Sequence, residues 1–191
     1  MTETAQPMPI IDCDVHNRFK DAKLTALWRY LPRAYQEDVR EWGINLPGVG
    51  YLNGGDRGYR GDSWPAGGGF PGSSLDLMRE QLLDAYHVQC AILLGQELRP
   101  LSTLPNADYA AALARAYNDY LVEEWLAAEP RLRGAMLIAT QDIPQAVKEI
   151  ERIGRHPGIV EVLVSNGARL PYGHRYYHPV FEVCEIGRAH V

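Results

Sequence analysis

The sequence predicts an α/β fold built from about four strand–helix units around a parallel sheet, and two observations support this prediction. Four short segments are almost continuously apolar, which is typical of parallel strands that are covered on both faces. These segments span residues 9–14, 89–94, 134–139 and 159–164. Predicted helices separate these segments. Such units form either a doubly wound open sheet or part of a closed barrel, and four are too few for an eightfold barrel, which needs about 250 residues.

The connections after the first strand are of two kinds. Two short helical stretches are predicted at residues 23–31 and 33–42, and Pro32 suits the start of the second. The segment 43–73 is then rich in glycine and proline and includes three consecutive glycines at 67–69. A connection of this length within a compact domain is either functional or disordered.

The later helices each have a recognisable first residue. Ser74, Asn106 and Asp142 are predicted N-caps, because their side chains can accept a hydrogen bond from a backbone N–H of the first turn. A last helix is predicted to begin near His178. The helix after Ser74 is expected to bury one apolar face, made of Leu75, Met78, Leu82 and Tyr86.

The composition excludes several partners. Lysine and arginine number 19 against 24 acidic residues, giving a net charge of −5, and no basic stripe with interleaved aromatic residues appears. Nucleic acid is therefore not an expected partner. The longest apolar runs are too short to cross a bilayer, and the N-terminus lacks the pattern of a signal peptide. We expect a cytoplasmic protein without membrane contact, whose three cysteines are reduced.

The last seven residues, Glu185 to Val191, match a sequence that is not typical of a protein end. Their sequence is the translation of GAG ATC GGA AGA GCA CAC GTC, the start of a common short-read sequencing adapter, whose next codon in frame is a stop. We therefore expect residues 1–184 to be a partial domain and residues 185–191 to be adapter read-through rather than native sequence. His190 is accordingly not a candidate for any site.

The candidate metal-binding residues lie at the end of the first predicted strand. Asp12, Asp14 and His16 are spaced by two, so their side chains are expected to project to the same side. A carboxylate and an imidazole that converge there suit Zn²⁺ or Mn²⁺, which accept mixed oxygen and nitrogen ligands. The spacing alone also fits a hydrogen-bonded capping pair.

Two other hypotheses concern the same strand. A strand that ends Asp-x-Asp resembles the nucleophile motif of haloacid-dehalogenase-type phosphatases, in which Asp12 would attack phosphorus, Asp14 would act as general acid and base, and Mg²⁺ would bridge them. Against this, His16-Asn17-Arg18 follows in place of the usual Gly- or Thr-containing turn. The remaining hypothesis is a non-catalytic half-barrel fragment that assembles with another copy.

Several motifs together resemble one family. They are Pro9-Ile-Ile-Asp-Cys-Asp-Val-His16, Ala116-Tyr-Asn-Asp-Tyr-Leu121, Arg131-Leu-Arg-Gly134, Pro157-Gly-Ile-Val160 and Tyr176-Tyr-His-Pro-Val-Phe-Glu182. In this order they resemble amidohydrolase family 2, the aminocarboxymuconate-semialdehyde-decarboxylase-like branch of the amidohydrolase superfamily. The resemblance implies the N-terminal half of a (β/α)₈ TIM-type barrel, truncated after about four units.

The resemblance also implies a function. Asp14 and His16 would be the first two ligands of a mononuclear divalent metal, with zinc expected and manganese as the alternative. The family's later histidine and catalytic acidic residue belong to the fifth and eighth strands, so this chain is expected to lack turnover. The full-length enzyme would hydrolyse or non-oxidatively decarboxylate a small carboxylated molecule, and the resemblance leaves a homo-oligomeric assembly open.

Overall fold

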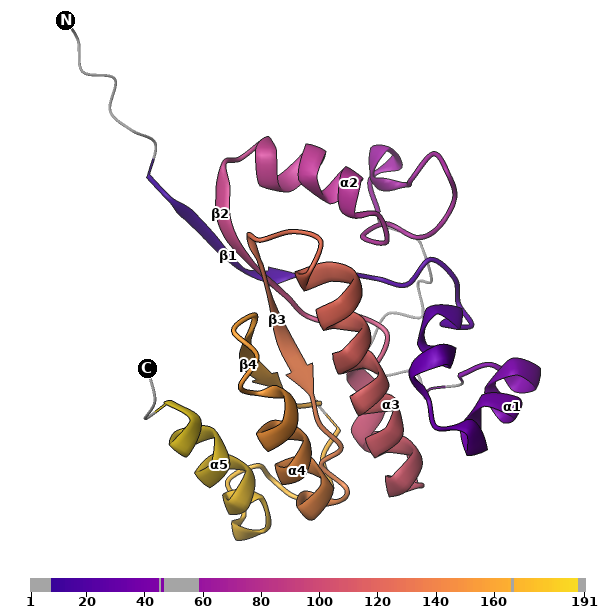
Figure 1. Cartoon of the computed structure of the whole chain (residues 1–191), viewed down its shortest axis with the longest axis vertical. Coiled ribbons are helices and arrows are strands. Elements are labelled where there is room, and N and C mark those ends of the chain that lie inside the picture. Colours follow the sequence, from indigo (N-terminus) through magenta and orange to yellow (C-terminus); the bar gives the residue numbers. More distant parts are fainter. Residues whose placement is uncertain (1–7, 45, 47–58, 166, 189–191) are drawn as a thin grey trace, which may run out of the picture.

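A computed structural model describes residues 8–44, 46, 59–165 and 167–188, and Figure 1 shows how its elements are arranged. The sheet has four strands in the order β1-β2-β3-β4, and each neighbouring pair is parallel. The strands are β1 (Ile10–Val15), β2 (Val88–Leu93), β3 (Leu132–Leu137) and β4 (Ile159–Leu163). The predicted α/β fold with four parallel strands is therefore confirmed, and the sequential strand order is consistent with the predicted part of a (β/α)₈ barrel.

The helical elements alternate with the strands as the sequence predicts. Three predicted N-caps are confirmed: the side chains of Ser74, Asn106 and Asp142 each accept a hydrogen bond from a backbone N–H of the first turn. The helices are η1 (Thr25–Tyr30), α1 (Arg33–Trp42), η2 (Gly61–Ser63), α2 (Leu75–Met78), η3 (Arg79–Asp84), η4 (Arg99–Thr103), α3 (Ala107–Tyr120), η5 (Leu121–Leu126), α4 (Ile143–Ile153), η6 (Arg175–Tyr177) and α5 (His178–Arg188).

Some boundaries and one buried face differ from the prediction. The first helical stretch is a 3₁₀ helix, η1, and β3 begins two residues before the predicted Gly134. Tyr86 was expected on an apolar helix face but is 58% exposed. The reason is local: η3 ends at Asp84, and the chain turns at His87, whose φ of 53° is left-handed.

Two predicted segments lie partly outside the described residues. In the glycine-rich segment 43–73, residues 45 and 47–58 are not described, and the part that is described includes the 3₁₀ helix η2 and turns. At the C-terminus α5 continues to Arg188, and residues 189–191 are not described. The adapter origin of residues 185–191 stays a prediction.

The core lies between the sheet and the helices that cover one of its sides. Helix α3 packs against β3, and α4 stands between α3 and α5 (Figure 1). Asn118 of α3 is completely buried, and its side chain donates to the backbone carbonyl of Leu137 and accepts from its N–H, at 3.0 and 2.8 Å. A single amide thereby satisfies both backbone groups of Leu137 at the end of β3.

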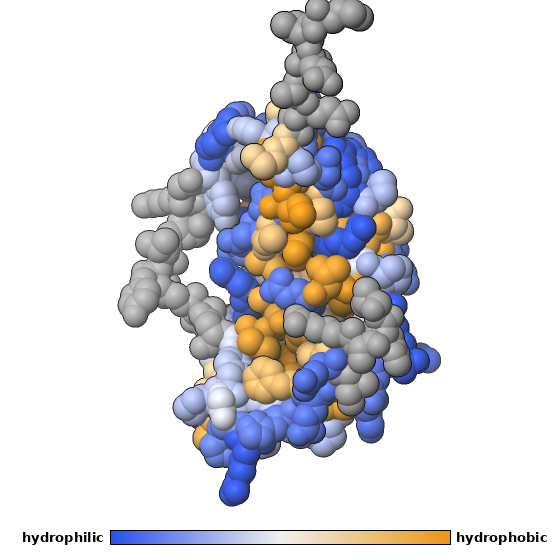
Figure 2. Space-filling view, turned by 90° about the vertical axis from the view of Figure 1, so that its left-hand side faces the viewer, coloured by the Kyte–Doolittle hydropathy of each residue, from blue (hydrophilic) through white to orange (hydrophobic). Residues whose placement is uncertain are grey.

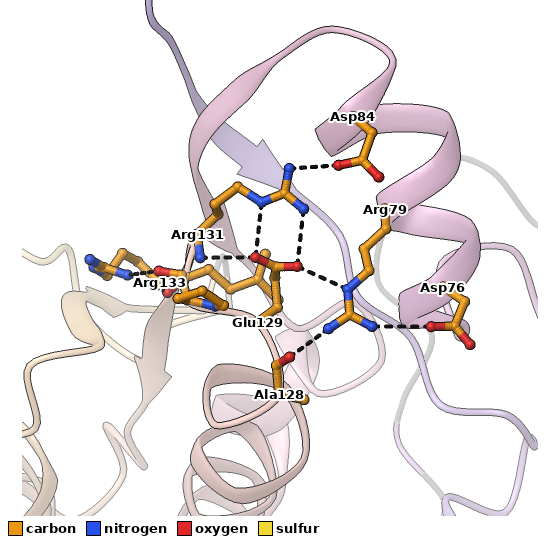
Figure 3. A network of polar contacts seen from close by, with 9 residues as sticks. Asp76, Arg79, Asp84, Ala128, Glu129, Arg131 and Arg133 are labelled. Carbon is orange, nitrogen blue, oxygen red and sulfur yellow. Dashed lines mark hydrogen bonds and ion pairs between the residues drawn. The ribbon is translucent and has the colours of Figure 1, made fainter.

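Charged side chains join the helices to the N-terminal end of β3 (Figure 3). The buried Glu129 accepts hydrogen bonds from Arg131 and from Arg79. Arg131 also donates to Asp84, and Arg79 donates to Asp76. This network, here called the Glu129 network, fixes the segment before β3 to the continuous helix formed by α2 and η3.

An apolar band remains on the surface. Figure 2 shows apolar side chains gathered on the face that lies at the left of Figure 1. Both edge strands contribute exposed apolar residues, Ile10 and Ile11 on β1 and Val160 on β4, and Phe181 of α5 is 51% exposed. Across the part of the chain that the structure describes, no helix is both long and apolar enough to span a membrane.

Candidate metal centre

The side chains of Asp14 and His16 meet at the C-terminal end of β1. Asp14 belongs to the strand and His16 directly follows it, so both project to the same side. Nε2 of His16 lies 3.2 Å from Oδ1 of Asp14, and the two side chains are 38% and 74% exposed. The structure therefore brings together the two residues that the sequence singles out as metal ligands.

A backbone carbonyl fixes the imidazole of His16. Its Nδ1 lies 3.0 Å from the carbonyl oxygen of Leu94, the residue after β2. A carbonyl can only accept a hydrogen bond, so Nδ1 carries the proton and donates it. Unless the ring is doubly protonated, Nε2 then presents a lone pair toward Asp14. Metal-binding histidines are oriented in this way by a partner on the other ring nitrogen.

The donor atoms fit a divalent cation. A metal bound at about 2.1 Å by an imidazole nitrogen and a carboxylate oxygen holds these atoms about 3.0 to 3.4 Å apart, for angles of roughly 90° to 109°. The observed separation of 3.2 Å lies within this range. Two acceptor atoms at this distance repel each other unless a proton or a metal cation lies between them. Asp14 and His16 therefore fit such a cation, although they are only two of the ligands that a site needs.

Asp12 does not complete the pair. Its Oδ1 accepts the backbone N–H of Asp14 at 3.1 Å, which holds this carboxylate beside its own strand. Within the described ranges, no group of three or more histidine, cysteine, aspartate or glutamate side chains is arranged to hold a metal. Asp12, Asp14 and His16 thus do not form the three-ligand cluster that their spacing alone allows.

Sequence reasoning missed the residues that support the pair. Nε of Arg18 donates to Oε1 of Glu97 at 2.7 Å, and the two side chains are 14% and 17% exposed. Asn17 is buried, and its Oδ1 accepts a long hydrogen bond of 3.5 Å from the hydroxyl of Tyr117. Glu97 follows β2 and Asn17 and Arg18 follow β1, and position after a strand end was the only signal in the sequence.

Burial is the largest influence on the pKa values of Glu97 and Tyr117, two of these supporting residues. It raises the pKa of the Glu97 carboxyl above its usual range, while the hydrogen bond from Arg18 opposes the rise. Burial also raises the pKa of the Tyr117 hydroxyl, so this group remains a neutral donor. Glu97 and Arg18 form a part-buried pair in which each side chain needs the other, because an isolated buried charge is costly.

A cavity of about 530 Å³ lies elsewhere on the molecule. It is lined by residues of the 65–80 segment together with Lys20, Tyr120, Glu124 and Trp125. Neither Asp14 nor His16 lines it. The cavity is therefore not assigned to the candidate ligands, although a large cavity is the default expectation for an active site.

Comparisons with known proteins agree with this arrangement. The family model described as amidohydrolase matches residues 11–191. No curated protein matches the chain. The matching solved structures include 5-carboxyvanillate decarboxylase LigW from Sphingomonas paucimobilis, with 22% identity and a TM-score of 0.61 over 94% of this chain and 49% of that one. This chain thus spans about half the length of that structure.

Two further structures show the same relation. The 2,6-dihydroxybenzoate decarboxylase from Rhizobium has 19% identity and a TM-score of 0.56, covering 94% of this chain and 47% of that one. A dihydroxybenzoic acid decarboxylase from a Polaromonas species, with bound manganese and the inhibitor 2-nitroresorcinol, has 20% identity and a TM-score of 0.55 at the same coverage, 94% and 47%. At such identities these structures establish the fold. The family match gives no support to the phosphatase alternative.

Proposed function

The chain belongs to the amidohydrolase family, and we propose that Asp14 and His16 are two ligands of the divalent-metal centre of an enzyme that decarboxylates a small carboxylated molecule. One observation carries the metal part of the proposal. The carbonyl of Leu94 accepts a hydrogen bond from Nδ1–H of His16, and Nε2 faces the carboxylate of Asp14 at 3.2 Å. This arrangement holds a ligand pair in place before any metal arrives.

Each residue has a distinct part in this function. A bound divalent metal would supply Lewis acidity and hold the carboxylate of the substrate. His16 offers a neutral nitrogen, and Leu94 keeps its ring from turning. Asp14 adds a negative charge, which strengthens binding of the cation and weakens its Lewis acidity. Zn²⁺ is the metal expected from the sequence, and the manganese bound in the similar structure from the Polaromonas species supports Mn²⁺ equally well.

The reaction class rests on the similar structures. The solved structures described above are of decarboxylases that act on aromatic acids by name. Hydrolysis is the second candidate, and the name of the matching family favours it. Because this chain covers about half of each similar structure and offers two candidate ligands in its described part, we expect weak metal binding and no turnover.

Metal binding by the 191-residue chain tests the first part. We expect electron paramagnetic resonance of free Mn²⁺ to show binding by the unaltered chain, and loss of most of that binding in Asp14→Asn and His16→Ala. Asp12→Asn is the matched control, because Asp12 bonds the backbone and stands outside the ligand pair; its affinity should stay within about twofold. Loss of binding in Asp12→Asn alone would favour a phosphatase-like site and would contradict our assignment.

The substrate class has its own test. With Mn²⁺ present, the protons of 2,6-dihydroxybenzoate should relax faster with the unaltered chain than with His16→Ala, because a carboxylate near the bound ion experiences its unpaired electrons. Benzamide, which has a similar ring and no carboxylate, should show no such difference. Equal relaxation of both ligands would argue against a preference for carboxylated substrates and would favour the hydrolytic alternative.

A further inference from the structure

Arg18 joins three separate parts of the structure near the candidate metal centre. Its Nε donates to Glu97, which follows β2. Its guanidinium carbon lies 4.5 Å from the ring centre of Phe70 and 5.5 Å from that of Tyr59, within the range of cation–π contacts. Arg18 therefore ties the end of β1 to the end of β2 and to the long connection.

The backbone beside Arg18 is tied to the same connection. Its N–H donates to the carbonyl of Gly72 at 2.9 Å. Gly72 has a φ of 83°, and a Cβ at this position would lie 2.7 Å from the carbonyl oxygen of His16. Only glycine lets the connection approach the ligand residue this closely. The segment 59–72 thus rests directly on the backbone of residues 16–18.

Three consecutive residues after β1 are each held by a different neighbour. His16 bonds the carbonyl of Leu94, Asn17 bonds the hydroxyl of Tyr117, and Arg18 pairs with Glu97. The His16 bond is made by a side chain that is 38% exposed, whereas the Arg18 pair is 14% and 17% exposed. The Arg18 pair is the better shielded of these two attachments, so its charge-assisted hydrogen bond is the stronger constraint.

We propose that Arg18 is a positioning residue that holds His16 in the orientation in which Nδ1 donates to Leu94 and Nε2 faces Asp14. The guanidinium is suited to this task because it is planar, so it can stack on Phe70 and Tyr59 while its edge donates to Glu97. A lysine keeps the charge and loses both the stacking plane and the fork of donors.

The orientation of His16 can be measured without metal. Long-range ¹H–¹⁵N spectra distinguish the two imidazole tautomers, and His16→Ala identifies the signals of His16. We expect Nδ1 to carry a proton in the unaltered chain, whether or not Nε2 also shares a proton with Asp14, and Arg18→Lys to show a share of the form that is protonated at Nε2 alone. Arg60→Lys is the matched control, since Arg60 lies in the same connection, is 78% exposed and pairs with Asp62; it should leave the Nδ1–H form unchanged.

Each result decides the question. If Arg18→Lys folds and retains the pure Nδ1–H form, the proposal is overturned. If Arg18→Lys does not fold, Phe70→Leu decides, because it removes the stacked ring and keeps the pair with Glu97. A mixture of tautomers in either Phe70→Leu or Glu97→Gln, which weakens the pair, supports the positioning role, and an unchanged Nδ1–H form in both rejects it.

The consequence for metal binding rests on the proposed function and is measured separately. Arg18→Lys should weaken Mn²⁺ binding roughly tenfold, as loss of a supporting contact does, although the charge near the site is unchanged. If Arg18→Lys shows mixed tautomers but an unchanged Mn²⁺ affinity, the effect of Arg18 on metal binding is refuted. Its role in orienting His16 would still be supported. If His16→Ala binds Mn²⁺ as well as the unaltered chain, the metal proposal fails, and the tautomer result still decides the role of Arg18.

Discussion

Replacing Glu129 with glutamine should lower the free energy of unfolding by about 3 kcal/mol at pH 7. Glu129 lies between η5 and β3, and its side chain is 6% exposed. Its two oxygens accept four hydrogen bonds, of which the Nε atoms of Arg79 and Arg131 each donate one at 2.9 Å (Figure 3). A glutamine of the same shape would lose the charge and turn an NH₂ group toward these donors.

The magnitude follows from the pKa of the carboxyl group. The hydrogen bonds from Arg131, together with the one from Arg79, lower the pKa of Glu129 from 4.5 to about 2 against the opposing effect of burial. Each unit corresponds to about 1.4 kcal/mol, so the ionised form stabilises the fold by about 3 kcal/mol relative to the protonated form. Because the pKa is lowered on folding, this stabilisation is complete above pH 4.5 and disappears as the pH falls toward 2.

Urea unfolding followed by tryptophan fluorescence at several pH values measures this contribution. The difference between the unaltered chain and Glu129→Gln should be constant from pH 7 to about 5 and should then shrink by about 1.4 kcal/mol per pH unit. Asp76→Asn is the control, since Asp76 joins the same network with a side chain that is 94% exposed; it should cost less than about 1 kcal/mol. A difference that stays constant down to pH 3 would refute the reasoning.

Two further substitutions test the packing at the C-terminal ends of β2 and β3. Asn118→Leu leaves the backbone N–H and C=O of Leu137 buried without their partner, so urea unfolding should show a loss of about 2 to 4 kcal/mol; a loss below about 1 kcal/mol would contradict this view of Asn118. Gly95→Ala places a Cβ 2.6 Å from the ring of Tyr117 and should cost about 1 to 3 kcal/mol in thermal unfolding. Gly61→Ala is its control, because nothing lies within 4 Å there, and an equal loss in both would show that crowding at Tyr117 is not the cause.

The sequence allowed prediction of the features that depend on neighbours in the chain. Helix starts at Ser74, Asn106 and Asp142 were predictable because a capping side chain bonds a backbone group three residues away. The contact between Asp14 and His16 was predictable because alternation along a strand is a local property. The register of β3 was less accessible, since Leu132 and Arg133 join the strand by pairing with Ala91 and Ile92 on β2.

Contacts between distant segments escaped prediction for a physical reason. Arg18 and Glu97 are 79 residues apart, and Arg79 and Glu129 are 50 apart. Charged residues at such separations carry no periodic pattern, because their pairing depends on the fold and not on the neighbouring sequence. Tyr86 shows that a local pattern can also predict too much. The apolar spacing continues past Asp84 to Tyr86, but the helix ends at Asp84 and Tyr86 is exposed.

Two carboxylates of this chain show how the neighbouring groups decide whether a carboxylate can bind a ligand or stabilises the fold. Glu129 precedes β3, and its oxygens are saturated by arginine donors, so it has no capacity left for a cation. Asp14 lies at the C-terminal end of β1 and is 74% exposed, and it faces Nε2 of His16, whose ring is held by Leu94 through the other nitrogen. The first arrangement lowers the energy of the folded chain, whereas the second keeps two donor atoms close together and able to bind. In parallel α/β folds the ends of the strands divide in this way, with binding residues at the C-terminal ends and stabilising ones at the N-terminal ends, and the two carboxylates follow that division.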